Sequence, residues 1–167
     1  MSQQNPYDIF LDGRPLDAIL GDSPGSIASL LEAIGSANAS KAPAPGKWSA
    51  AEIVAHLADC ELVFGFRLRQ TLAEDDYTIQ PFDQDRWAVS SDYSAIGAGQ
   101  ALATFTALRN WNLQLIARSL PAAANRPVSH PERGAMTFQT IVETMAGHDL
   151  NHLEQLARIA ASPTPAA

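Results

Sequence analysis

A chain of 167 residues with 46% hydrophobic side chains can bury the core of one domain without disulfide bonds, and its single cysteine, Cys60, cannot form an internal one. Its formal charge of −7 repels phosphate backbones, so nucleic acid is not an expected partner, and no apolar run reaches the ~20 residues that a membrane span needs. Because residues 1–10 also lack the basic and apolar regions of a secretory signal, we expect a cytoplasmic protein with a single domain over residues 1–167.

The first predicted helix follows a proline signal. Ser23-Pro24 has the form of an N-cap followed by proline at the first helical position, which predicts a helix from about Pro24 to Ala37. Residues 40–47 contain two prolines and a glycine, which cannot continue a helix, so this stretch is expected to be a connector.

A capping box begins the second predicted helix. Ser49 and Glu52 have the spacing at which each side chain satisfies a free backbone amide of the other, and Trp48 precedes them as a hydrophobic staple. Apolar residues then recur at alternating steps of three and four until about Glu74, which predicts one long helix. Residues 76–94 lose this period and are expected to form a long ordered connection.

Two more helices are predicted in the second half of the chain. One begins near Ala95 and is closed by Pro121, after which an irregular segment is expected. The other begins near Thr137, its N-cap, and residues 162–167 form a proline-rich tail that we expect to be frayed. The predicted fold is all-α, a four-helix bundle over about residues 15–160 in which a long crossover joins helices two and three.

Three histidines on these helices have the spacing of a metal site. His148 and His152 are four residues apart, so they lie on one face of the fourth helix with Cβ atoms about 5–6 Å apart. Imidazole is a ligand for zinc, nickel, copper and iron, and a catalytic zinc site commonly has three protein ligands. His56 is the only other histidine on a helical core seam, because His130 lies in a loop beside Pro131.

The depth of these histidines in the bundle tests the idea. His56 lies some seven residues from the start of its helix, and His152 some eight residues from the end of its own. At a rise of ~1.5 Å per residue, the two histidines lie at nearly the same height if helices two and four run antiparallel. In a parallel arrangement His148 and His152 would lie roughly 6–12 Å further along, too far for bonds of about 2 Å. A metal site therefore requires antiparallel helices two and four, and the alternative is surface or hydrogen-bonded core histidines.

Five stretches resemble the DinB/YfiT superfamily. They are residues 47–49 (KWS), 53–59 (IVAHLAD), 80–88 (QPFDQDRWA), 130–134 (HPERG) and 147–152 (GHDLNH). The resemblance spans roughly residues 15 to 160. Its most specific part is the early histidine combined with the late HxxxH motif.

The resemblance implies a four-helix bundle with a crossover topology, frequently homodimeric, whose three histidines bind a metal ion. His56, His148 and His152 would then hold one divalent transition metal, nickel or zinc before iron, manganese or cobalt. Characterised relatives include thiol S-transferases that use bacillithiol or mycothiol, and many other members are named metal-dependent hydrolases. The expected partner is therefore a small-molecule substrate, including a low-molecular-weight thiol.

Two further residues are candidates for contact with the substrate or support of the ligands. Asp59 follows His56 by three positions, so it could orient the imidazole or accept a proton. Gln155 lies one turn beyond His152, where its amide could bond a metal-bound water or the substrate. An ordinary polar residue at the mouth of the bundle is the alternative for Gln155. Cys60 is expected to be a small buried hydrophobic residue rather than a ligand.

Other polar residues are expected to have structural roles. Asn112 and Arg67 interrupt apolar helix faces, so each needs a hydrogen-bond partner if buried. His130 and Arg133 belong to a turn that fixes the start of the fourth helix, and we place both outside the site.

The leading hypothesis for function is a metal-dependent enzyme, in which the ion polarises a small substrate or lowers the pKa of a bound thiol or water. A thiol S-transferase and a hydrolase are the two versions. A non-catalytic bundle, in which the ion only joins helices two and four, or an interaction module, is the remaining alternative. An accessible pocket would favour the enzyme, and a closed shell of four protein ligands the structural role.

Overall fold

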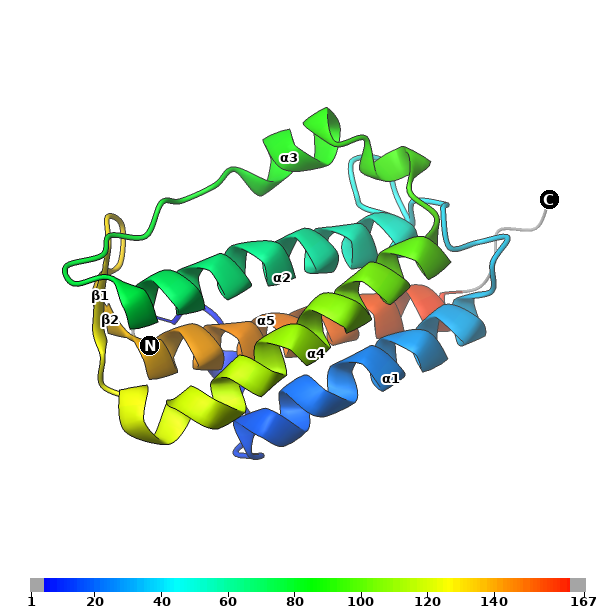
Figure 1. Ribbon diagram of the computed structural model, residues 1–167. Helices are drawn as coiled ribbons and strands as arrows, with labels where there is room; N and C mark the ends of the chain where they lie inside the picture. The colour runs from blue at the N-terminus through cyan, green and yellow to red at the C-terminus, as the bar shows by residue number, and fades with distance from the viewer. Residues whose placement is uncertain (1–4, 163–167) are drawn as a thin grey trace.

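Four long helices form the body of the protein, whose computed structural model describes residues 5–162 (Figure 1). They are α1 (Leu16–Ile34), α2 (Ala50–Ala73), α4 (Ala98–Ala123) and α5 (Phe138–Ala161). The shorter elements are the 3-10 helices η1 (Asp8–Phe10) and η2 (Tyr93–Ala95), the helix α3 (Gln84–Ser90) and the hairpin strands β1 (Pro127–His130) and β2 (Gly134–Thr137). The predicted four-helix bundle is confirmed. Of the tail predicted to be frayed, residues 163–167 lie outside the described part of the chain.

A long crossover makes α2 and α4 parallel. Figure 1 shows both helices running from the same end of the bundle, with α1 and α5 running the opposite way. Helices α2 and α4 contact each other. In addition, α4 packs against α1, and α2 packs against α5. The crossover contains α3, which lies along the outer side of α2, and η2. The antiparallel arrangement of α2 and α5 that a metal site requires is therefore present.

Local capping signals place α2 and α5 as predicted. The side chain of Ser49 accepts a hydrogen bond from the amide of Glu52, and the Glu52 carboxylate accepts one from the amide of Ser49 at 2.7 Å. Thr137 caps α5 by the same reciprocal arrangement with Thr140. The first turns of the two helices that carry the histidines are thus set by nearby residues.

Pro24 lies inside α1 rather than at its start. The predicted start near Pro24 is wrong, because the helix already begins at Leu16. Proline has no amide proton to donate to the carbonyl four residues earlier, which is that of Leu20. This carbonyl accepts a hydrogen bond from Nη1 of Arg109 at 2.9 Å instead. A side chain of α4 therefore satisfies the group that Pro24 leaves free.

The segment between α4 and α5 is a hairpin rather than irregular. The strands pair antiparallel, with Pro127 opposite Thr137 and His130 opposite Gly134. Gly134 has a φ of 76°, which glycine adopts without strain at the end of the turn. Helix α4 also continues past Pro121, its predicted end, to Ala123.

Apolar side chains from all four long helices fill the bundle. They form two clusters, one that includes Phe138 and Met145 and one that includes Leu57 and Phe105. Within residues 5–162, no helix combines the length and the apolar character that a membrane span needs.

Candidate metal centre

Three histidine side chains meet between α2 and α5. Their exposed fractions are 1% for His56, 4% for His148 and 5% for His152. Nε2 of His148 lies 3.1 Å from Nε2 of His56 and 3.1 Å from Nε2 of His152. The structure therefore brings together the three residues that were selected by spacing and depth.

These distances fit a shared cation better than they fit hydrogen bonds alone. A neutral imidazole nitrogen carries either one proton or one lone pair, so Nε2 of His148 can make one good hydrogen bond with another Nε2 but not two. Two nitrogens bound at about 2.05 Å to one ion are roughly 2.9 Å apart at a right angle and roughly 3.3 Å apart at the tetrahedral angle. The observed 3.1 Å lies between these values. Both nitrogen pairs thus fit ligation of a shared divalent transition metal.

All three imidazoles are held in the neutral form that binds metal. Burial lowers the pKa of His56 to about 3 and that of His152 to about 4, and it holds the pKa of His148 well below its usual value. The proximity of His152 lowers the pKa values of His56 and His148 further. Because the metal ligand is the neutral imidazole, an ion would not have to displace protons from these side chains at pH 7.

Gln155 fixes the tautomer of His152. Oε1 of Gln155 lies 3.1 Å from Nδ1 of His152. An amide oxygen can only accept, so Nδ1 of His152 donates and Nε2 keeps its lone pair. This is the arrangement in which a residue behind a metal ligand orients it. Gln155 therefore contacts the candidate ligand His152, and its contact with a bound water or substrate stays a prediction.

The N-terminal segment closes one side of the histidines. The ring of Tyr7 meets that of His148 edge to face, with centroids 5.1 Å apart. Gly147 makes this approach possible, because a Cβ at that position would lie 2.5 Å from the backbone oxygen of Tyr7. On the α2 side, the indole of Trp48 lies 4.9 Å from the ring of His56. No sequence pattern predicted a role at the site for Tyr7 or Gly147.

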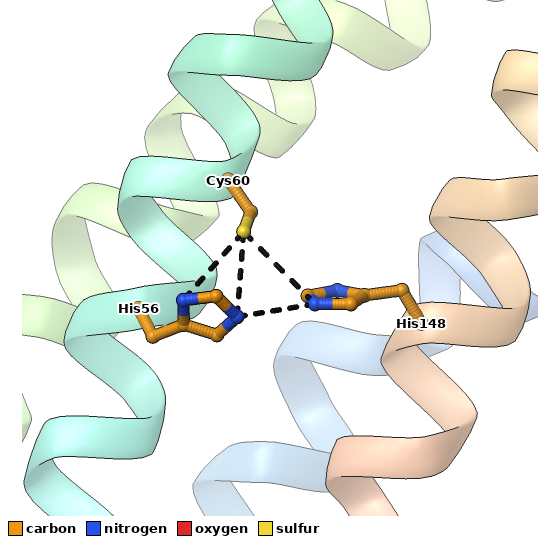
Figure 2. A group of neighbouring side chains, drawn as sticks. All are labelled: His56, Cys60 and His148. Atoms are coloured by element: carbon orange, nitrogen blue, oxygen red, sulfur yellow. Dashed lines mark hydrogen bonds between the residues drawn. The ribbon is translucent and has the colours of Figure 1, made fainter. Parts of the chain in front are cut away.

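Cys60 also lies beside the histidines. Figure 2 shows its sulfur beside the ring of His56, with Sγ 3.5 Å from Nε2 of His56 and 3.9 Å from Nε2 of His148. The ligand atoms of these three residues lie within 4.8 Å of one another. Burial raises the pKa of the Cys60 thiol, so without an ion it stays protonated. Nε2 of His152 already carries a lone pair, whereas Cys60 would have to lose a proton before it could bind an ion.

Asp59 has a different partner from the one considered for it. Its Oδ2 accepts a hydrogen bond of 2.6 Å from the hydroxyl of Tyr93 in η2. Burial and this hydrogen bond raise the pKa of Tyr93, which keeps the hydroxyl protonated as the donor. Asp59 therefore ties α2 to the crossover, and it lines neither of the cavities beside the histidines.

Two cavities are lined by histidines of the candidate site. One of about 560 Å³ is lined by His152 and Gln155, together with Lys47 and Arg158. The other, of about 180 Å³, is lined by residues that include His56 and His148. Residues Tyr7 and Gln84 line both. Each cavity is thus lined by at least one of the three histidines.

Comparison with known protein families identifies the family of this chain. Residues 20–156 match the family model for the DinB superfamily, which is most of the chain. The chain belongs to the DinB superfamily. The predicted resemblance is thus confirmed.

Individual DinB relatives are distant in sequence. A protein of Oceanobacillus iheyensis named "Putative metal-dependent hydrolase" is 26% identical over 114 residues, which are 68% of this chain and 66% of that protein. A protein of Geobacillus kaustophilus with the same type of name is 28% identical over 116 residues, 68% of this chain and 65% of its own length. The chain thus aligns with slightly less than two thirds of the length of these relatives.

A solved structure has the same fold. YfiT from Bacillus subtilis, described as having an unusual four-helix bundle topology, aligns with a TM-score of 0.75 over 86% of this chain and 84% of its own. The two sequences are 20% identical. At this identity the likeness shows the fold and not the reaction.

A buried ion network lies behind the histidines of this DinB bundle. Arg109 is fully buried and donates from Nη1 to Asp149 at 2.6 Å and from Nη2 to Glu61 at 2.7 Å. Burial alone would lower the pKa of Arg109, but the two carboxylates outweigh it and raise the pKa. Asn112 donates to the backbone and side-chain oxygens of Glu61, both at 2.9 Å, which fits its expected structural role. Asp149 follows His148 directly, so this network also anchors the ligand-bearing part of α5.

Three residues given structural roles in the sequence analysis line the smaller cavity. They are Arg67 of α2, His130 of β1 and Arg133 of the hairpin turn. The hairpin carries two of them to the histidines, and this could not be foreseen while the segment was taken to be irregular. The HPERG motif at residues 130–134 was the sequence signal that could have pointed to His130 and Arg133 as cavity residues.

Proposed function

We propose that the protein is a metal-dependent enzyme in which His56, His148 and His152 bind one divalent transition-metal ion, nickel or zinc. The observation that carries this proposal is the pair of 3.1 Å contacts at Nε2 of His148. A bound ion supplies Lewis acidity and lowers the pKa of a thiol or water at its open position. Three neutral ligands leave the full charge of the ion available for this purpose.

The chain's own residues shape a protected reaction site. The rings of Tyr7 and Trp48 cover His148 and His56, and the ring of Phe64 lies 6.0 Å from that of His148. These apolar walls limit water around the ligands, which strengthens electrostatic interactions there. Gln155 keeps His152 in the ligating tautomer.

Two cavities support a reaction with two organic reactants. A low-molecular-weight thiol in one cavity and an electrophile in the other would meet at the histidines. The thiol sulfur forms the new bond to the electrophile and the leaving group departs with the electron pair, while the thiol proton passes to solvent. This favours thiol S-transfer as the reaction.

Hydrolysis is the second candidate, and the names of the relatives favour it. Both the Oceanobacillus and the Geobacillus relatives are named as metal-dependent hydrolases. In this version water takes the place of the thiol, and one cavity holds the substrate.

Activity screening of metal-loaded protein tests the proposal. Protein reconstituted with Ni²⁺ or Zn²⁺ is assayed for conjugation of small thiols to monochlorobimane and for hydrolysis of activated esters. We expect the wild type to accelerate one of the two reactions, with His152→Ala and metal-free protein at background. Gln114→Ala, on the exposed face of α4, is the matched control and keeps full activity. Equal rates for wild type and His152→Ala in both assays would refute the enzyme proposal.

We further propose a cytoplasmic homodimer. Exposed apolar side chains on α2, Leu62 and Phe66, border a pocket shared with Phe82 and Trp87 of the crossover and support a contact surface there. Light scattering with the 17.9 kDa chain tests this, and a mass equal to one chain at micromolar concentration argues against the dimer.

A further inference from the structure

We propose that the smaller cavity is a carboxylate subsite, in which Arg67 and Arg133 bind an acidic group of the substrate. The cavity is lined by both arginines and by the ring of His148. The inference rests on the proposed function, since it names the class of substrate held beside the candidate ligands. A substrate with one carboxylate and one group that reacts at the histidines would fill both places.

Arg67 has unused donors where it lines the cavity. Its guanidinium lies between two rings, with Cζ 5.8 Å from the centroid of Phe64 and 5.9 Å from that of Phe82. Of the five N–H donors of arginine, one makes a hydrogen bond, from Nη2 to the carbonyl of Gln80 at 3.2 Å. Nε is buried without a partner. Nη1 and the second N–H of Nη2 are the donors left for the two oxygens of a carboxylate.

Arg133 adds a second charge without a counter-ion. It is half-buried in the hairpin turn. Within residues 5–162, the ion pairs are made by other arginines, and neither Arg67 nor Arg133 has a carboxylate oxygen within 4 Å. The two cations are close enough to affect each other. Burial is the main cause that lowers the pKa of Arg67, and the positive charge of Arg133 lowers it further. An anion between them would remove this repulsion.

The charge of the lining selects an anion. Two arginines face one acidic residue, the exposed Glu132, and burial lowers the pKa of His130, which stays neutral. The backbone amide of Glu132 donates to Nδ1 of His130, which leaves the His130 proton on Nε2 as a further donor. This positive cavity lies in a chain of formal charge −7. The volume of this cavity, about 180 Å³, is below the roughly 300–1,000 Å³ of ordinary ligand pockets. The part of the substrate that carries the carboxylate is therefore small.

Side-chain NMR of the full chain tests the subsite without reference to the metal. The Nε–Hε signals of ¹⁵N-labelled protein, with and without Zn²⁺, are followed during titration with propionate and with neutral propionamide. We expect saturable shifts of the Arg67 and Arg133 signals with propionate alone, and no saturable shift of exposed Arg118. Equal responses to propionamide, equal responses at Arg118, or tighter binding of inorganic phosphate than of propionate would overturn the carboxylate subsite.

A thiol comparison tests the position of the subsite relative to the ion. Co²⁺-loaded protein is titrated with 3-mercaptopropionate and with 2-mercaptoethanol, and thiolate binding is read from charge-transfer absorption. We expect at least tenfold tighter binding of the acid, about 1.4 kcal/mol. Arg67→Gln should lose this preference, Arg67→Lys should keep part of it, and Arg118→Gln should keep all of it, with cobalt content and circular dichroism equal throughout.

The two proposals fail in different ways. Equal binding of both thiols by wild-type protein would overturn the subsite and leave the metal centre standing. Failure to bind cobalt would overturn the proposed function, and the propionate titration of metal-free protein would still decide whether the subsite exists.

Discussion

Replacing Arg109 by leucine is expected to destabilise the fold more than any surface change, because it strips a buried charge network of its cation. Asp149 and Glu61 would be left in the interior without the guanidinium that now lies 2.6 and 2.7 Å from them. The carbonyl of Leu20, which Pro24 leaves without a helical donor, would lose its partner as well. Removing one partner of a buried pair costs about 3–5 kcal/mol.

This cost is a large part of the total stability. Domains of this kind unfold with about 5–15 kcal/mol, and the free energy of unfolding falls by about 1–3 kcal/mol per molar urea. A loss of about 4 kcal/mol at a slope of about 2 kcal/mol per molar moves the urea midpoint down by about 2 M. The loss of helical circular dichroism in urea measures this midpoint.

Two further variants separate charge burial from loss of side-chain volume. Arg118→Leu, on the exposed face of the same helix, should stay within about 0.5 kcal/mol of the wild type. Combining Arg109→Leu with Glu61→Gln and Asp149→Asn should recover part of the stability, because no charge is then left unpaired. An Arg109→Leu midpoint equal to that of Arg118→Leu would refute this account of the network.

Three other predictions concern the histidines. Their pKa values are lowered by burial, to about 3 for His56 and about 4 for His152, whereas an unfolded histidine titrates near 6.5. The unfolded chain therefore binds more protons between these values, so metal-free protein should be most stable above about pH 6.5. Its free energy of unfolding should fall by up to about 1.4 kcal/mol per pH unit for each titrating histidine as the pH falls toward 4. Urea midpoints that do not change over this pH range would contradict this prediction. Gln155→Ala should weaken zinc binding about 10- to 100-fold in a chelator competition, with Gln114→Ala unchanged; equal affinities would exclude the tautomer role. Cys60→Ser should retain the metal content of the wild type, and loss of the metal would make Cys60 a ligand.

The parts of the fold that depend on local sequence could be predicted. The capping box at Ser49 and the cap at Thr137 fix where α2 and α5 begin, since both act over three residues. The constant helical rise then turns sequence position into depth, which placed His56 level with His148 and His152. The structure has the antiparallel helices that this comparison required.

The features that depend on distant partners could not be predicted. Pro24 fits a helix start by its local signal, and its tolerance inside α1 depends on Arg109, 85 positions away in the chain. The network of Arg109, Glu61 and Asp149 has no sequence period, because its members come from three helices. Arg133 reaches the cavity only because residues 127–137 pair as a hairpin.

Elemental analysis tests the central claim most directly. Wild-type protein, His148→Ala and the control Gln114→Ala are purified in parallel, and their transition metals are measured per chain. The account predicts close to one ion per chain in wild type and control, and a small fraction of that in His148→Ala, since Nε2 of His148 is the nitrogen that both other ligands approach. Equal and negligible metal in wild type and His148→Ala, also after incubation with Ni²⁺ or Zn²⁺, would contradict it.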